Sequence, residues 1–138
     1  MEFGLLGPLA VRRAGVAVPV PQGKQRALLA ALLLSPDTIV SLRDLTETLW
    51  GTAPPPSSRV TIQNYVMRLR KALGDGNGTR IMTHAGGYSI CVGDGELDVT
   101  RFRSGLAASR AAARGGQWAC AAAEARTALS LWRGEPLA

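Results

Sequence analysis

The segment VTIQNYVMRLRKAL, residues 60–73, combines helical periodicity with side chains of the kind that recognise nucleic acids. At 100° per residue its apolar side chains gather on one face; they are Ile62, Val66, Leu69 and Leu73. The opposite face carries polar and basic side chains, namely Thr61, Asn64, Arg68 and Lys71. No acidic residue occurs between positions 59 and 74, whereas a solvated helix usually mixes acidic and basic residues four positions apart. The outer face therefore suits an anionic partner.

The side chains on this outer face are types that read bases in the major groove of DNA. Asn64 matches the N6 and N7 atoms of adenine, Arg68 matches the O6 and N7 atoms of guanine, and Thr61 offers a hydroxyl. Arg70 and Lys71 follow near the C-terminal end, where phosphate contacts position a protein without selecting a sequence. Two apolar side chains suited to thymine methyl groups lie beside them, Val60 and Met67. The alternative is a solvated basic face without a ligand.

Several elements must hold this helix in place. Residues 2–20 contain short apolar runs broken by glycines, a pattern that predicts two or three short antiparallel strands. Residues 23–36 predict a helix that is apolar almost all round and therefore buried. Ile39-Val40 predicts a short strand.

Two further helices follow. The helix expected over residues 41–51 begins with a serine that has an aspartate three residues later, in the manner of a capping box, and it ends at a glycine. The helix over 58–73 is expected to be capped by Ser57 or Ser58 and to stop at Gly74.

Residues 80–92 predict a β-hairpin whose turn is Ala85-Gly86-Gly87. Three helices followed by such a hairpin have the layout of a winged helix-turn-helix. We expect Thr83, His84 and Tyr88 to bring the hairpin to an adjacent minor groove or backbone. The alternatives are an exposed loop position for His84 and packing against the third helix for Tyr88.

Basic side chains near helix starts extend the candidate interface. Lys24 and Arg26 flank the start of the first helix, and Arg43 lies in the first turn of the second. Cations and helix N-termini at such places bind phosphates. Arg59, at the start of the third helix, is a further candidate for a backbone contact. For the first three, an ordinary surface position is the alternative.

The composition shifts to alanine-rich helix after a flexible boundary at 93–98. Two antiparallel helices joined at Gly115-Gly116 are expected there, which gives domains of 1–93 and 98–138. The expected fold class is mainly α with small β-sheets: a winged helix-turn-helix followed by a helical hairpin. Six arginines give the second domain an excess of positive charge: Arg101, Arg103, Arg110, Arg114, Arg126 and Arg133. They form solvated faces or contact a DNA backbone or polymerase.

Composition limits the classes of function. The 138 residues carry a net charge of +6 and are 46% hydrophobic, so a packed core and an anionic partner are both expected. Cys91 and Cys120 lack metal-ligand spacing and are expected to be small buried thiols. One histidine and scattered carboxylates form no catalytic set, so we expect no enzyme, no metal and no cofactor. Without a leader or a membrane-spanning run, a cytoplasmic, nucleoid-associated protein is expected.

Several motifs together resemble the Streptomyces antibiotic regulatory protein (SARP) family: FGLLGPLAV, GKQRALLAALLL, RVTIQNYVMRLRKALG, GGY and ALSLWRGEPLA. Residues 1–93 resemble its OmpR/PhoB-type winged helix. Residues 98–138 resemble the start of its bacterial transcriptional activator domain, a tetratricopeptide-like helical array. The resemblance implies a transcriptional activator that binds promoter direct repeats of double-stranded DNA as a head-to-tail homodimer. It also implies recruitment of RNA polymerase through its σ subunit and α C-terminal domain, at antibiotic or secondary-metabolite genes.

By position, the resemblance implies base-facing roles for Asn64 and Arg68 and a wing contact near the phosphates for Thr83. It implies flanking contacts for Thr61, Tyr65, Arg70 and Lys71. Family members often carry an arginine at the wing tip, where this chain has His84-Ala85, so weaker minor-groove readout is expected.

Full activator domains continue beyond one helical hairpin, and repeat arrays bury their core only between neighbours. We therefore expect either a truncated piece of a longer protein, or a short chain whose hairpin packs on the winged helix or on a second copy. The side chains expected to line the hairpin are Phe102, Leu106, Trp118, Leu129, Leu131 and Trp132.

Two other classes of function compete with a DNA-binding activator. One is a protein-interaction module that docks on RNA polymerase or another partner without specific DNA contact. The other is a basic protein that binds a membrane surface or RNA, although few aromatic platforms are available for single-stranded RNA.

Overall fold

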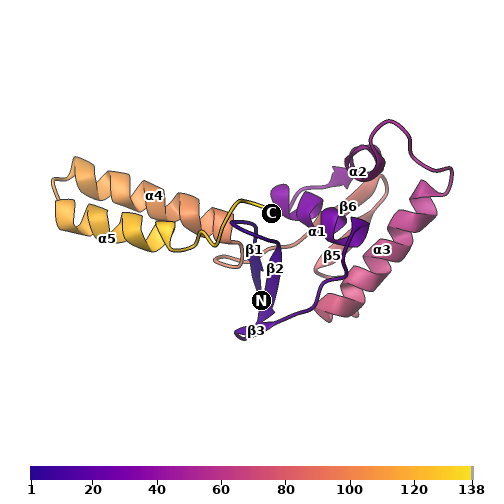
Figure 1. Ribbon diagram of the computed structural model, residues 1–138, viewed down its shortest axis with the longest axis horizontal. Helices are drawn as coiled ribbons and strands as arrows, with labels where there is room; N and C mark the ends of the chain where they lie inside the picture. Colours follow the sequence, from indigo (N-terminus) through magenta and orange to yellow (C-terminus); the bar gives the residue numbers. More distant parts are fainter. Residues whose placement is uncertain (138) are drawn as a thin grey trace. The chain divides into compact units, whose positions relative to one another are not determined.

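The structure, a computed structural model, describes residues 1–137 and divides into two compact units. The central unit comprises residues 18–92, and the terminal unit joins residues 1–17 to the described residues from 93 onward. Each unit has its own helices and its own three-stranded sheet (Figure 1). Five helices and two small antiparallel sheets make up the described residues, which confirms the expected fold class.

The central unit contains three helices and a hairpin. Its elements, in chain order, are α1 (Lys24–Leu34), β4 (Val40–Ser41), α2 (Leu42–Trp50), α3 (Ser58–Leu73), β5 (Ile81–His84) and β6 (Gly87–Ile90). The sheet order is β4-β6-β5, so the winged helix-turn-helix layout is confirmed. Strand β4 starts one residue later than predicted, because Val40 and Ser41 are the residues that pair with β6.

Aliphatic side chains fill the core of the central unit. Those less than 2% exposed are Leu28, Leu29, Leu32, Leu33, Leu45, Ile62, Val66, Leu69, Ile81 and Ile90. The four leucines of α1 in this set recur on one face of the helix, whereas Leu34 is 62% exposed. Helix α1 is therefore not buried all round, and the prediction was wrong at Ala27 and Leu34, which are both exposed.

The capping predictions held for α2 but failed at the start of α3. The Ser41 hydroxyl accepts a hydrogen bond of 3.1 Å from the Asp44 N–H. Ser57 precedes α3 with φ −88° and ψ 11° and makes no side-chain cap, because a capping residue needs an extended backbone. At the other end Gly74 is left-handed (φ 69°), and its N–H donates to the carbonyl oxygens of Arg70 and Lys71.

Gly87 allows β4 to approach the wing closely. A Cβ on Gly87 would overlap the carbonyl oxygen of Val40. Ser41 pairs with Gly87 in the antiparallel register, and the neighbouring pair is Val40 with Tyr88. The absence of a side chain at Gly87 therefore lets the wing pair with the strand that leads into α2.

The terminal unit contains three short strands and a helical hairpin. Its elements are β1 (Glu2–Gly4), β2 (Ala10–Arg13), β3 (Val16–Ala17), α4 (Asp98–Arg114) and α5 (Trp118–Leu129). The strands form an antiparallel sheet in the order β1-β2-β3, as predicted for residues 2–20.

Residues 1–17 group with α4 and α5 rather than with the helices of the central unit. The buried carboxylate of Asp98, at the start of α4, accepts the N–H groups of Leu5 and Leu6, each at 2.9 Å. The Phe3 N–H donates to the Glu96 carbonyl oxygen at 2.6 Å. The sequence predicts a first domain of 1–93 that includes these strands, because no local pattern signals contacts made across more than 90 residues.

Small residues bring α4 and α5 together. A Cβ on Gly105 would lie 2.9 Å from the Cβ of Ala128, so the two helices approach closely at this level. Phe102 and Trp132 pack edge to face, with ring centroids 5.5 Å apart.

The outer side of α5 is less buried than predicted. Trp118 is 70% exposed and Leu129 is 59% exposed, so the expectation that they line the hairpin was wrong. Cys120, expected to be buried, is exposed, because Ala121 and Ala128 form the side of α5 that faces inward. Among the described residues, no helix is both long and apolar enough to cross a membrane.

Candidate nucleic-acid interface

Helix α3 presents a buried aliphatic face and an exposed polar face. Ile62, Val66 and Leu69 are at most 1% exposed. The exposed residues of the helix are Arg59, Val60, Gln63, Asn64, Met67, Arg68 and Lys71. Asn64 and Arg68, predicted from the sequence to face bases, are therefore open to solvent. So is Lys71, predicted to contact a phosphate. Thr61 and Tyr65 are half-buried and lie at the edge of this surface.

Gln63 belongs to the exposed face, although it is not among the side chains predicted from the sequence to contact DNA. It stands four residues after Arg59 and four before Met67, both exposed, so these side chains form one row along the helix. A glutamine amide, like that of asparagine, matches the N6 and N7 atoms of adenine. The helical spacing of Arg59, Gln63 and Met67 is the signal in the sequence that could have identified this row.

Arg70 faces the wing rather than open solvent. Its Nε and Nη2 atoms donate to the Ile81 carbonyl oxygen at 2.9 and 2.7 Å, and Nη2 also donates to the Thr83 hydroxyl at 2.8 Å. The sequence predicted a phosphate contact for this guanidinium. The structure instead gives it three hydrogen bonds that join α3 to β5 and hold Thr83.

Asp75 fixes the start of the wing. Asp75 is 8% exposed, and its carboxylate accepts the N–H groups of Ile81 at 2.8 Å, Thr79 at 2.9 Å and Arg80 at 3.1 Å. Burial alone raises the pKa of this carboxyl, but the hydrogen bonds from Ile81, Arg80 and Thr79 outweigh that effect and hold the pKa below its ordinary value. The only acidic residue between α3 and the wing therefore serves an internal turn.

The wing tip divides into exposed and packed residues. Thr83 and Ala85 are exposed, whereas Tyr88 is only 6% exposed and pairs with Val40 of β4 and Thr83 of β5. Tyr88 is therefore buried, and its packing against the third helix stays a prediction. The Nε2 atom of His84 lies 2.7 Å from the Ser89 hydroxyl. His84 thus faces its own hairpin and is only half-buried.

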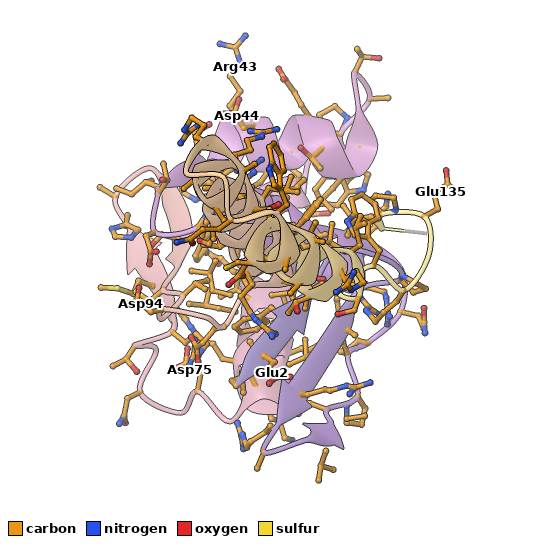
Figure 2. All side chains as sticks on the ribbon, turned by 90° about the vertical axis from the view of Figure 1, so that its left-hand side faces the viewer. Glu2, Arg43, Asp44, Asp75, Asp94 and Glu135 are labelled. Atoms are coloured by element: carbon orange, nitrogen blue, oxygen red, sulfur yellow. The ribbon has the colours of Figure 1, made fainter. Side chains whose placement is uncertain are left out.

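The basic residues around α1 and α2 differ in how free they are. The Lys24 ammonium donates to the Leu49 carbonyl oxygen and lies 5.5 Å from the centre of a Trp50 ring. Arg26 donates to the Val20 carbonyl oxygen. Arg43 is strongly exposed and projects away from α2 (Figure 2), with its Nε 3.5 Å from a Glu47 carboxylate oxygen. Lys24 and Arg26 therefore have internal partners, and Arg43 is the most open of the three.

Among residues 1–137, no cluster of three or more histidine, cysteine, aspartate or glutamate side chains could hold a metal ion. The exposed chemistry of the central unit is thus basic, amide and apolar, concentrated on α3.

Two family models match the chain in succession. The model described as "Transcriptional regulatory protein, C terminal" matches residues 20–90, and the model described as "Bacterial transcriptional activator domain" matches residues 97–138. The first match covers the central unit with all the candidate residues above, and the second covers α4 and α5.

Several curated proteins are similar over nearly the whole chain. Regulatory protein AfsR of Streptomyces coelicolor is 36% identical over 100% of this chain and 14% of its own length. Transcriptional regulatory protein EmbR of Mycobacterium tuberculosis is 37% identical over 99% of the chain and 36% of its own length. Regulatory protein DnrI of Streptomyces peucetius is 34% identical over 99% of the chain and 53% of its own length. The chain therefore spans about half or less of these relatives.

A solved structure, Mycobacterium tuberculosis EmbR in complex with a low affinity phosphopeptide, is similar with a TM-score of 0.94 and 35% identity. The match covers 99% of this chain and 37% of that one. The two consecutive family models, the relatives and the winged-helix architecture agree, and the chain belongs to the SARP family of transcriptional regulatory proteins.

Proposed function

We propose that the chain binds double-stranded DNA sequence-specifically, with α3 in the major groove. One observation carries this proposal: α3 has a fully buried aliphatic face and an opposite, exposed face without any acidic residue. Such a face carries no carboxylate that would repel the phosphates of a DNA backbone. Its amides and its guanidinium group can form hydrogen bonds with base edges.

The roles of individual side chains follow from their exposure. Asn64 and Arg68 read bases, and the half-buried Thr61 contributes at the edge. Arg59 and Lys71 contact phosphates, with Arg43 as an additional cation, and the Thr83 hydroxyl meets the backbone beside the wing. Arg70 positions Thr83 through the hydrogen bond between their side chains.

The promoter architecture follows the SARP resemblance. We propose that two copies bind direct repeats head to tail and activate transcription by contacting the σ subunit and the α C-terminal domain of RNA polymerase. We place this activity in the cytoplasm, at the nucleoid. The names of AfsR and DnrI as regulatory proteins support a role in gene control, and antibiotic or secondary-metabolite genes are the proposed targets.

Selection of bound duplexes from a random library tests this proposal. A recurring motif in two copies at fixed spacing would support specific binding to direct repeats. A library that returns no enriched motif, from protein shown to be folded, would overturn it.

A protein-interaction module remains the second candidate. The exposed large side chains of the terminal unit favour it, since Trp118 is 70% and Trp132 41% exposed. Footprinting on an enriched duplex separates the two candidates, because an interaction module without specific DNA contact leaves no protected bases.

A further inference from the structure

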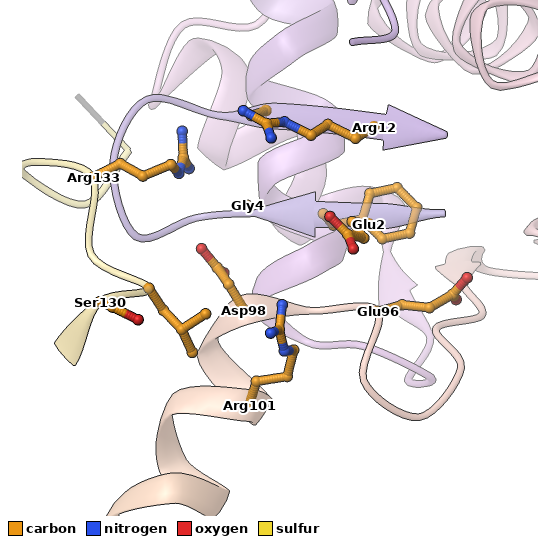
Figure 3. Close-up of a pocket in the computed structure, with 11 residues that line it drawn as sticks. Glu2, Gly4, Arg12, Glu96, Asp98, Arg101, Ser130 and Arg133 are labelled. Carbon is orange, nitrogen blue, oxygen red and sulfur yellow. The ribbon is translucent and has the colours of Figure 1, made fainter. Parts of the chain in front are cut away.

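A cavity of about 190 Å³ lies within the terminal unit, where β1, β2, the start of α4 and the segment after α5 meet (Figure 3). Three arginines line it from three different segments: Arg12 on β2, Arg101 on α4 and Arg133 after α5. None of the DNA-reading residues proposed above belongs to it.

Arg133 is exposed, and its backbone and two neighbouring glycines determine where its side chain lies. Its backbone N–H donates to the Leu6 carbonyl oxygen at 2.7 Å. A Cβ on Gly4 would lie 2.6 Å from the Arg133 Nη2 atom, and a Cβ on Gly7 would lie 2.9 Å from the Arg133 Cβ. Because Gly4 and Gly7 have no side chains, the Arg133 side chain has room to lie against them. Its guanidinium group is therefore next to Gly4 of β1.

The three guanidinium groups make no hydrogen bond or ion pair with any side chain or backbone group of residues 1–137. Figure 3 shows Arg12 and Arg133 reaching into the space above Gly4, and Arg101 approaching from the start of α4. Like charges gathered around one cavity repel each other, and carboxylates in the same lining offset only part of that repulsion where they are engaged by other groups.

The cavity also holds three carboxylates, but two of them already have partners. Asp98 uses both oxygens to accept the N–H groups of Leu5 and Leu6. Glu96 lies 3.4 Å from the N-terminal ammonium and accepts the Gly93 N–H. Glu2 stands opposite Arg12 in the strand register, yet no ion pair joins the two side chains. The cations of the cavity are therefore more available to a ligand than its anions.

We propose that this cavity binds a small oxyanion, the phosphate or carboxylate group of a small molecule. Guanidinium forks match such groups in two-point hydrogen bonds. The volume corresponds to roughly six water molecules, which limits the ligand to a small one. The carboxylates in the lining repel the further phosphates of an extended polyanion, so nucleic acid is a poor occupant.

An amide-resolved NMR titration of the full chain tests this proposal, with pyrophosphate and citrate added separately at constant ionic strength. We expect saturable shifts at the Gly4, Leu5 and Gly7 amides with at least one of these anions. Arg133→Gln should weaken binding about tenfold or more, because it removes a charge-assisted contact. Gly4→Ala keeps every charge but displaces the Arg133 guanidinium, and should also weaken binding.

Arg103→Gln is the matched control, because Arg103 is an exposed arginine of α4 outside the cavity. It should bind the anion as the wild type does, and so should a variant with Arg68→Ala and Lys71→Ala, which impairs only the proposed DNA surface. Absence of saturable shifts would overturn the proposal. So would equal losses in Arg133→Gln and Arg103→Gln. A glutamate-rich peptide is titrated in parallel, and shifts that it alone produces would mark a protein-docking surface and also overturn the proposal.

Discussion

Single residues on the exposed face of α3 differ in what they offer to a duplex. Amides and guanidinium groups distinguish base pairs, whereas a lysine ammonium acts as a point charge on the backbone. Arg68 and Lys71 lie three positions apart on this face and are both exposed, so they form a matched pair for separating the two kinds of contact.

Arg68→Ala is expected to weaken binding to the selected duplex by about 1–3 kcal/mol and to relax base choice at one position. Lys71→Ala should weaken specific and random duplexes alike and reduce the slope of log affinity against log salt by about one. Gel-shift titrations at several salt concentrations measure both effects. Identical profiles for the two variants would contradict the assigned roles.

Gln63→Ala tests the exposed row that includes Arg59 and Met67. If Gln63 reads a base, its loss should cost about 1–3 kcal/mol on the selected site and broaden the preference at one position. Selecting duplexes with the variant measures this directly. An unchanged motif would show that Gln63 does not contact a base. The amide and guanidinium groups proposed to contact bases would then be only those of Asn64 and Arg68.

At the scale of elements, the wing depends on two side chains that come from outside its strands. Arg70 reaches from α3 to Ile81 and Thr83, and Asp75 gathers the N–H groups that precede and begin β5. Arg70 joins α3 to the hairpin, and Asp75 joins the loop that follows α3 to the start of β5, so the two residues together help to set where the wing lies relative to α3.

Arg70→Ala should lower the free energy of unfolding by roughly 1–2 kcal/mol, because hydrogen bonds from a charged group to a carbonyl oxygen and a hydroxyl are lost. Urea denaturation measures this loss, and amide exchange should accelerate at the β5 residues. Arg68→Ala, on the same helix but exposed, serves as control and should leave stability nearly unchanged. Equal stabilities for the two variants would contradict the conclusion that Arg70 holds the wing in position.

The lowered pKa of Asp75 makes the stability of the fold depend on pH in the acidic range. Its pKa in the folded state lies below the ordinary value of 3.8, so folding is favoured when the carboxylate is ionised. This contribution is fully present above the unfolded-state pKa and disappears as the pH falls through the folded-state pKa. Asp75→Asn should therefore be less stable at neutral pH and show a weaker loss of stability below about pH 4. Parallel stability curves for both proteins would contradict this account.

The sequence predicted the elements of the central unit well because each is locally encoded. The apolar period of α3, the Ser41–Asp44 cap and the glycine turn of the wing depend only on neighbouring residues. The direction of Arg70 and the burial of Tyr88 depend on elements that meet only in the folded chain, so they could not be read from a local pattern. The same holds for the packing of residues 1–17 with α4, which the periodicity of the strands does not encode.

At the scale of the whole molecule, the two units carry different chemistry. The central unit presents the acid-free face of α3, and the terminal unit presents exposed tryptophans and a cavity with three arginines. We therefore propose two separate uses for the positive charge of the chain: duplex binding in the central unit and anion binding in the terminal unit. The arginines of α4 that lie outside the cavity, such as Arg103, are expected to be solvated.

The most direct measurement compares two charge reversals, Arg68→Glu and Arg103→Glu, for affinity to the same selected duplex. Both variants have the same net charge, so general electrostatics cannot distinguish them. If the exposed face of α3 enters the groove, Arg68→Glu should lower affinity about a hundredfold or more, while Arg103→Glu remains within a few-fold of the wild type. Equal losses in the two variants would show that charge alone attracts DNA and would contradict the proposal that α3 reads it.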